Sequence, residues 1–166
     1  MKTDSNPADV GFFGQLPHLE HGDVSLSQSN AILRYVGKQA GLNGDSDKAY
    51  ALSEMLIEEA ADIFSMFNKG MYSESREKSF DDLFATSFPK QFGVLEKLIP
   101  EGSVYFLPGA KRSTGGYAIA AVLDIAKALQ PDCLDAFPKL TAFHAAMVSS
   151  SAFDGIRDMP EYFKRK

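Results

Sequence analysis

The sequence predicts a mainly α-helical protein in which a β-hairpin and one helix precede an all-helical bundle. Two observations predict this class. Alternating apolar positions flank a tight turn once, between residues 16 and 26, whereas apolar residues recur at helical spacing over residues 47–71, 79–98 and 116–129. The run Leu42-Asn43-Gly44-Asp45 has the composition of a linker. We therefore expect two units, residues 1–43 and residues 44–166.

The predicted hairpin turns at His21-Gly22-Asp23, because glycine adopts a positive φ at no steric cost. Ser27 and Gln28 are candidates to cap the helix that follows, and Gly41 is expected to end it. The apolar positions of the two strands are Leu16, Leu19, Val24 and Leu26, and those of the helix are Ala31, Ile32, Tyr35, Val36 and Ala40.

Long helices are predicted for the second unit. Pro89 lies inside the stretch 79–98 and is expected to kink or interrupt that helix, because proline has no N–H to donate. The helix predicted at 116–129 is apolar on most of its circumference, which is typical of a buried helix. A final helix is expected to follow the run Cys133–Leu140 and to continue through Val148.

Composition excludes several classes of protein. The 166-residue chain has a net charge of −5 and no basic cluster longer than Lys164-Arg165-Lys166, which argues against nucleic-acid binding. Its longest apolar run, Ala118–Leu123, is too short to span a bilayer, and no signal-peptide pattern opens the sequence. The single cysteine, Cys133, fits a reducing compartment, cytoplasmic or another intracellular one, and its apolar neighbours predict a buried, unreactive thiol.

The run His18-Leu19-Glu20-His21 contains residue types that bind metals. These residues alternate across a strand and a turn, so we interpret them as solvent-exposed hairpin residues and predict no metal site. The glycines between Gly109 and Gly116 lack the spacing and the lysine of a phosphate-binding loop.

Two short motifs resemble the cytosolic glutathione transferases, nearest the pi and sigma classes. They are Gln15-Leu16-Pro17 and Gln28-Ser29-Asn30, and the resemblance extends over residues 14–166 through Ile32–Tyr35, Cys133–Leu140 and Pro160-Glu161-Tyr162. It implies a thioredoxin-like unit, represented here by the hairpin and its helix, followed by the family's all-helical C-terminal domain. That unit normally begins with a βαβ piece of about 30 residues or more, for which the 14 residues before Gln15 leave no room. We therefore expect a truncated unit without the family's catalytic Tyr or Ser, and no catalytic residue is assigned.

The resemblance implies a partial binding site for glutathione. Gln15, Leu16 and Pro17 correspond to the strand that pairs with the cysteinyl part of glutathione, provided that Pro17 keeps the family's cis bond. Gln28 and Ser29 correspond to the helix start that binds the γ-glutamyl carboxylate, an anion that a helix N-terminus favours. Asp62 corresponds to the aspartate that reaches across a dimer to the γ-glutamyl amine.

The resemblance also implies a weaker start for the helix at 116–129. The family begins this helix with a Ser or Thr cap and an Asp three residues later, whereas here Ser113 is followed by Gly116. Loss of the reciprocal bond predicts a helix start weaker by about 1 kcal/mol.

Two functions follow from these observations. The first is a glutathione transferase-like protein with glutathione as ligand or co-substrate, in which conjugation is weak or lost. The alternative is a non-catalytic interaction or scaffold subunit of a larger assembly. Because a two-stranded hairpin with an open edge is marginally stable, we expect a homodimer mate or another protein to cover the edge at Gln15–Leu19.

Overall fold

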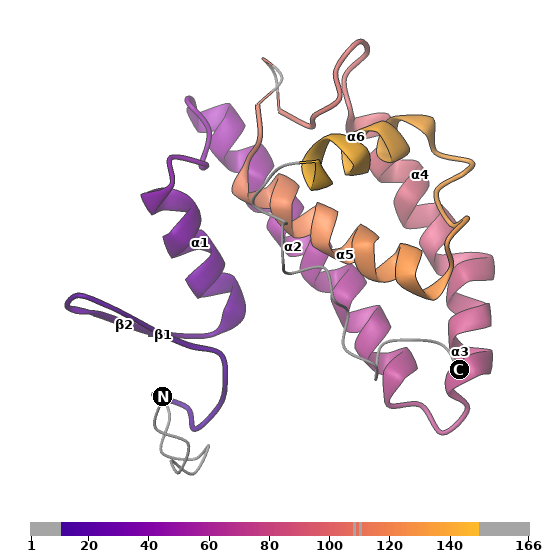
Figure 1. The fold of residues 1–166 in the computed structure, drawn as a ribbon, viewed down its shortest axis with the longest axis horizontal. Helices are drawn as coiled ribbons and strands as arrows, with labels where there is room; N and C mark the ends of the chain where they lie inside the picture. Colours follow the sequence, from indigo (N-terminus) through magenta and orange to yellow (C-terminus); the bar gives the residue numbers. More distant parts are fainter. Residues whose placement is uncertain (1–10, 108, 110, 150–166) are drawn as a thin grey trace. The chain divides into compact units, whose positions relative to one another are not determined.

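The computed structural model describes residues 11–107, 109 and 111–149. It divides into two compact units, Met1–Asn43 and Gly44–Lys166 (Figure 1). The motif Pro160–Tyr162 lies outside the described residues.

The first unit consists of a hairpin and one helix. Strands β1 (His18–His21) and β2 (Val24–Ser27) pair in antiparallel register, from His21 opposite Val24 at the turn to His18 opposite Ser27 at the open end. The connecting loop is Gly22-Asp23, and Gly22 has a φ of 62°, as the turn prediction requires. Helix α1 (Ser29–Gln39) follows directly. Leu16, which the sequence pattern placed on the first strand, lies before β1.

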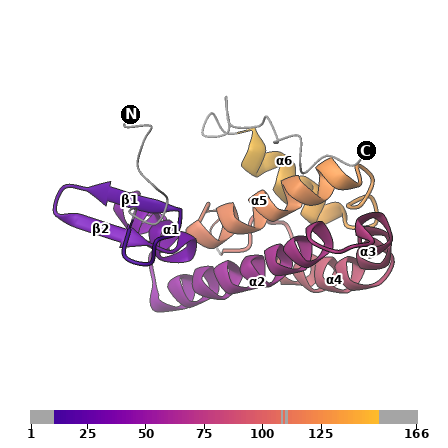
Figure 2. The same ribbon diagram turned by 90° about the horizontal axis from the view of Figure 1, so that it is seen from below.

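The second unit is helical, as predicted. Its elements are α2 (Asp47–Met71), α3 (Arg76–Asp82), the π-helical segment η2 (Leu83–Ser87), α4 (Phe88–Leu98), α5 (Thr114–Leu129) and α6 (Pro138–Val148). Helix α5 lies along α2 (Figure 2). Helices α3 and α5 begin a few residues before the apolar patterns that predicted them. The Ser113 side chain caps α5, whereas Ser75, at the N-cap position of α3, makes no side-chain capping hydrogen bond.

The π-helical turn explains how the structure accommodates Pro89. The Phe88 N–H donates to the carbonyl of Leu83, five residues earlier, so the helix is wider immediately before the proline. A proline ring clashes with the carbonyl four residues before it in an ordinary α-helix, and one π-helical turn relieves such crowding. The predicted interruption is therefore a local widening between α3 and α4.

Phenylalanine rings form a large part of the core of the helical unit. Phe88 is fully buried, and its ring centroid lies 4.7 Å from that of Phe67, 4.9 Å from Phe84 and 5.7 Å from Phe92. Helix α5 is buried on most of its circumference, which confirms the interpretation of its apolar composition.

The start of α5 contains a close contact with α2. Ser113 caps the helix by accepting the N–H of Gly116 at 3.0 Å, as expected. Gly115, however, has a packing role, because its N–H donates to Ser53 Oγ at 3.0 Å and a Cβ there would lie 2.8 Å from Leu56 Cβ. Gly115 therefore allows α5 to approach α2 closely.

Helix α6 is capped from a distant part of the chain. Its N-cap residue, Phe137, offers no side-chain cap. Instead, the Glu96 carboxylate on α4 accepts the N–H groups of Lys139 at 2.9 Å and Leu140 at 2.8 Å. One carboxylate thus fixes α6 against α4 and complements the positive end of the α6 dipole.

Candidate functional site

The open end of the hairpin brings together the two sequence motifs that predicted the site. Cross-strand pairing places His18 opposite Ser27. Pro17 precedes one member of this pair and Gln28 follows the other, so the Leu16–Pro17 and Gln28–Ser29 segments leave the hairpin at the same end. The Leu16–Pro17 peptide bond is cis, as the resemblance implies.

The segment before β1 offers an unpaired backbone. Gln15 and Leu16 are exposed, and the Leu16 side chain is 69% accessible. Within the described residues, the N–H and C=O groups of Leu16 have no hydrogen-bond partner. An extended ligand backbone can use such groups as an added strand would.

Gln28 has an unusual backbone conformation. Its φ is 78° and its ψ is 118°, and it is the one non-glycine residue with a positive φ in the described part of the chain. Such conformations are avoided by L-residues and cluster at ligand sites. Gln28 occupies the N-cap position of α1, but no side chain there makes a capping hydrogen bond.

Neither expected cap therefore operates at α1. Ser27 does not cap α1, since its hydroxyl accepts the Phe12 N–H and contacts His18 instead. The Gln28 side chain makes no capping hydrogen bond. The first-turn N–H groups of α1, beginning at Ser29, carry no side-chain cap. Uncapped N–H groups and the helix dipole together favour an anion such as a carboxylate.

Asp62 belongs to the helical unit and is exposed on α2. Its carboxylate has no partner among the described residues. Glu59 lies one turn earlier on the same helix, and burial together with the neighbouring Asp62 charge raises the pKa of its carboxyl group. Glu59 Oε1 is buried without a hydrogen-bond partner in the described structure. These two acids make the local surface of α2 attractive to a cation.

His18 corrects the interpretation of the histidine-containing run. Glu20 and His21 are exposed, but the His18 side chain is only 11% accessible. Its Nδ1 lies 3.2 Å from Ser27 Oγ and its Nε2 lies 3.3 Å from Ser25 Oγ. The predicted turn at His21-Gly22-Asp23 left the strand register open, and the observed two-residue loop Gly22-Asp23 sets His18 opposite Ser27.

Two further interpretations of the sequence concern the Cys133 thiol and metal binding. Burial raises the pKa of the Cys133 thiol to about 11, so this half-buried group is a neutral thiol at pH 7 and agrees with the predicted low reactivity. Among residues 11–107, 109 and 111–149, no group of three or more His, Cys, Asp or Glu side chains could hold a metal ion. In the same residues, none of the helices combines the length and apolar character that a membrane crossing requires.

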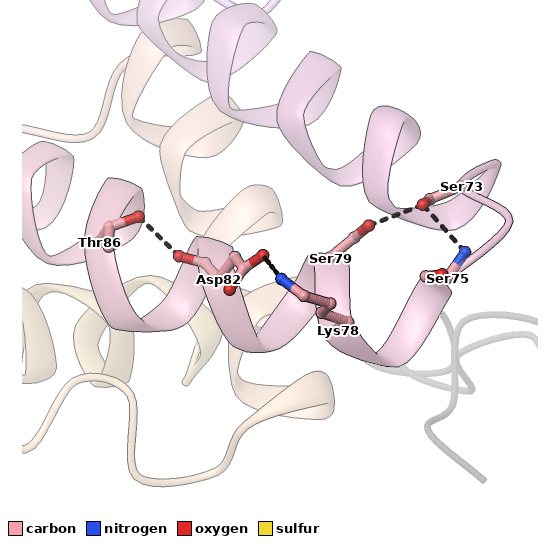
Figure 3. A network of polar contacts seen from close by, with 6 residues as sticks. All are labelled: Ser73, Ser75, Lys78, Ser79, Asp82 and Thr86. Carbon is pink, nitrogen blue, oxygen red and sulfur yellow. Dashed lines mark hydrogen bonds and ion pairs between the residues drawn. The ribbon is translucent and has the colours of Figure 1, made fainter.

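A cavity of about 310 Å³ lies between α2 and the α3–η2 segment. Its polar groups largely satisfy one another (Figure 3): Ser79 donates to Ser73 at 2.7 Å, Lys78 pairs with Asp82 at 2.7 Å, and Thr86 donates to the Asp82 carbonyl at 2.6 Å. The network joins the turn after α2 to the following helix. It contains no nucleophile paired with a base, so we assign it a structural role.

Two family models match the chain. The glutathione S-transferase N-terminal domain matches residues 3–38, and the glutathione S-transferase C-terminal domain matches residues 61–152. The first range contains the hairpin and most of α1, and the second contains Asp62.

Similar proteins give the same result. The chain is 34% identical to a glutathione S-transferase of Dirofilaria immitis over 80% of this chain and 64% of that protein. It is 31% identical to glutathione S-transferase P of Capra hircus, over 92% of this chain and 73% of that protein. A pi-class glutathione S-transferase structure from Onchocerca volvulus matches with a TM-score of 0.75 at 32% identity, over 82% of this chain and 66% of that one.

These matches define the class of protein as one with the glutathione-transferase fold. The chain spans about two thirds of the length of these relatives. The chain belongs to the glutathione S-transferase family, and its similar proteins and structures include pi-class members.

Proposed function

We propose that this chain binds glutathione through the open end of its hairpin, with Asp62 supplied by a second copy. The observation that carries the proposal is the meeting of an unpaired Leu16 backbone and an uncapped α1 N-terminus at one end of a two-stranded sheet. The first group fits the cysteinyl backbone of glutathione. The second fits the γ-glutamyl carboxylate.

The charges of glutathione suit this division of roles. Its γ-glutamyl end carries a carboxylate and an amine side by side. The N–H groups at Ser29 favour the carboxylate, and the unpartnered Asp62 carboxylate favours the amine. Gln15, Pro17 and Gln28 shape the surface between them. In this proposal Asp62 acts across a homodimer, as the family resemblance implies.

Conjugation is a separate question from binding. Activation of the glutathione sulfur requires a hydroxyl or a cation beside it. Tyr35 is the tyrosine of the first unit among its described residues, and its hydroxyl lies 2.8 Å from His21 Nδ1, at the turn end of the hairpin. It therefore does not serve the open end. We propose glutathione binding with weak conjugation by this chain alone.

Calorimetric titration of glutathione into the purified chain tests the proposal. We expect a Kd below about 1 mM, equivalent to −4 kcal/mol. Asp62→Asn should weaken binding several-fold, whereas Asp132→Asn, which removes another exposed and unpartnered carboxylate, should not. The dipeptide Cys-Gly, which lacks the γ-glutamyl group, should bind much more weakly than glutathione. No heat from millimolar glutathione would refute the proposal.

A specific observation favours a second function, that of an interaction subunit. Phe12 and Phe13 are 71% and 64% accessible, next to Leu16 and the open edge of β1. Exposed apolar side chains beside an unpaired strand edge are typical of a surface that a partner covers. Purification of the chain in fixed stoichiometry with a larger assembly, without retention on glutathione resin, would support this alternative.

A further inference from the structure

His18 and Ser27 form the cross-strand pair that lies between the two halves of the proposed site. We propose that their side-chain contact clamps the open end of the hairpin and thereby positions Leu16 and Gln28 for the ligand. His18 is in this view a positioning residue, acting through Ser27 without touching glutathione. The inference rests on the proposed function, because it concerns the same site.

The hydrogen-bond arrangement around Ser27 is complete. Ser27 Oγ accepts the Phe12 N–H at 3.3 Å and lies 3.2 Å from His18 Nδ1. With one lone pair occupied by Phe12, the Ser27 hydroxyl can donate to Nδ1 of a neutral imidazole. The opposite ring nitrogen, Nε2, then carries the proton and donates to Ser25 Oγ at 3.3 Å. A single ring therefore links β1 to two positions of β2.

The same cluster holds the chain that leads into Gln15. Gly11 has a φ of 74°, and a Cβ at this position would lie 2.6 Å from Ser27 Oγ and 2.8 Å from His18 Nδ1. Glycine thus lets the turn at residues 11–14 pass close over the pair. Three segments converge on His18 and Ser27: this turn, the start of β1 and the end of β2.

The clamp is more buried than the other histidine contact of the hairpin. Ser27 is 7% accessible and the His18 side chain 11%, so water competes little for their hydrogen bond. His21 forms a comparable contact with the Tyr35 hydroxyl at 2.8 Å, but that contact is exposed and lies at the turn end. The exposed contact between His21 and Tyr35 therefore serves as an internal control for the clamp.

Ser27 immediately precedes Gln28, whose left-handed backbone begins α1. A conformation of this kind persists only when its surroundings hold it. Fixing the Ser27 side chain fixes the residue on one side of Gln28. On the other side, the Gln28 carbonyl accepts the Ile32 N–H at 3.0 Å. Exchange of the Ile32 amide hydrogen therefore reports whether the start of α1 keeps its geometry, with or without glutathione.

The test compares variants of His18 and Ser27 by two measurements, glutathione affinity and Ile32 amide exchange. The Asn side chain places a polar atom near the position of Nδ1, whereas Gln reaches the position of Nε2. We expect Ser27→Ala and His18→Gln to weaken glutathione binding roughly five- to tenfold, the value of a buried hydrogen bond, and to accelerate Ile32 exchange. His18→Asn, Ser25→Ala and the control His21→Asn should stay near wild type in both measurements.

Other results overturn the clamp. Wild-type affinity and unchanged Ile32 exchange in both Ser27→Ala and His18→Gln would do so. Weaker binding with unchanged Ile32 exchange would mean that His18 contacts the ligand directly. Faster exchange throughout the β1–β2 ladder in both variants would mean general loss of the hairpin. If wild type itself shows no glutathione binding, the proposed function fails, and Ile32 exchange in the same variants decides the clamp independently.

Discussion

Replacing Gly115 or Gly93 by alanine is the same chemical change in two helices, yet the structure predicts opposite effects on stability. At Gly115, on α5, a Cβ would overlap the carbonyl oxygen of Ser53 and lie 2.8 Å from Leu56 Cβ. At Gly93, on α4, the nearest atom is Phe137 Cε1 at 3.9 Å, an ordinary van der Waals contact. The two positions therefore separate helix propensity from the packing of α5 against α2.

The expected magnitudes follow from opposing contributions. Alanine in place of a helical glycine stabilises by about 0.5–1 kcal/mol where it fits, which is the whole effect expected of Gly93→Ala. At Gly115, forcing the helices apart costs about 1–3 kcal/mol. Loss of the buried bond from its N–H to Ser53 Oγ costs about 1–3 kcal/mol more. The net prediction for Gly115→Ala is a loss of about 1–5 kcal/mol.

Urea unfolding followed by far-ultraviolet circular dichroism measures both variants. With a slope of about 2 kcal/mol per molar urea, the midpoint of Gly115→Ala should fall by about 0.5–2.5 M, and that of Gly93→Ala should rise slightly. An unchanged or higher midpoint for Gly115→Ala would refute the reasoning that this glycine is required for close approach. A large loss in Gly93→Ala would show that the geometry around α4 is wrong.

Three further predictions concern the helical unit. Glu96→Gln should lose about 1–3 kcal/mol of stability in the same urea assay, because one of two partly buried N–H groups at the start of α6 loses its acceptor. The exposed Glu101→Gln should change it by less than about 1 kcal/mol. Phe88→Ala should lose about 3–5 kcal/mol, and Phe64→Ala, at a side chain that is 40% accessible, far less. Burial raises the pKa of the Cys133 thiol from 9.0 to about 11, so alkylation by iodoacetamide should be slow at pH 7 and accelerate toward pH 11. By linkage, the contribution of this neutral thiol to folding stability is present below pH 9 and is lost as the pH rises toward 11. Fast alkylation at pH 7 would contradict that assignment.

Local patterns in the sequence were sufficient for the main elements. The apolar spacing over residues 47–71 predicted α2 with the bounds that the structure shows, Asp47–Met71. The glycine turn predicted the hairpin, and the apolar circumference of residues 116–129 predicted a buried α5. In each case the signal lies within one element, where periodicity and turn chemistry act directly.

Interactions between distant residues were not predictable in this way. Glu96 caps a helix that begins more than forty residues later, and nothing in the composition of α4 indicates that partner. The close approach at Gly115 depends on Ser53, a residue of another helix more than sixty positions earlier. At the candidate site, the motifs indicated which residues form the proposed site, and this stays a prediction. The left-handed Gln28 and the His18–Ser27 contact depend on side-chain packing at the end of the hairpin.

The hairpin register connects a local turn signal in the sequence with the contact between His18 and Ser27. Side chains alternate between the faces of a strand, so a slip of one residue would move His18 to the opposite face and separate it from Ser27. The Gly22-Asp23 loop sets that register, although it lies at the other end of the hairpin from Leu16 and Gln28. The loop therefore contributes to the geometry of the candidate site, although it lies at the opposite end of the hairpin. A unit with only two described strands can therefore hold a defined geometry at its open end, because the turn fixes which residues meet and the partly buried contact between His18 and Ser27 keeps them together.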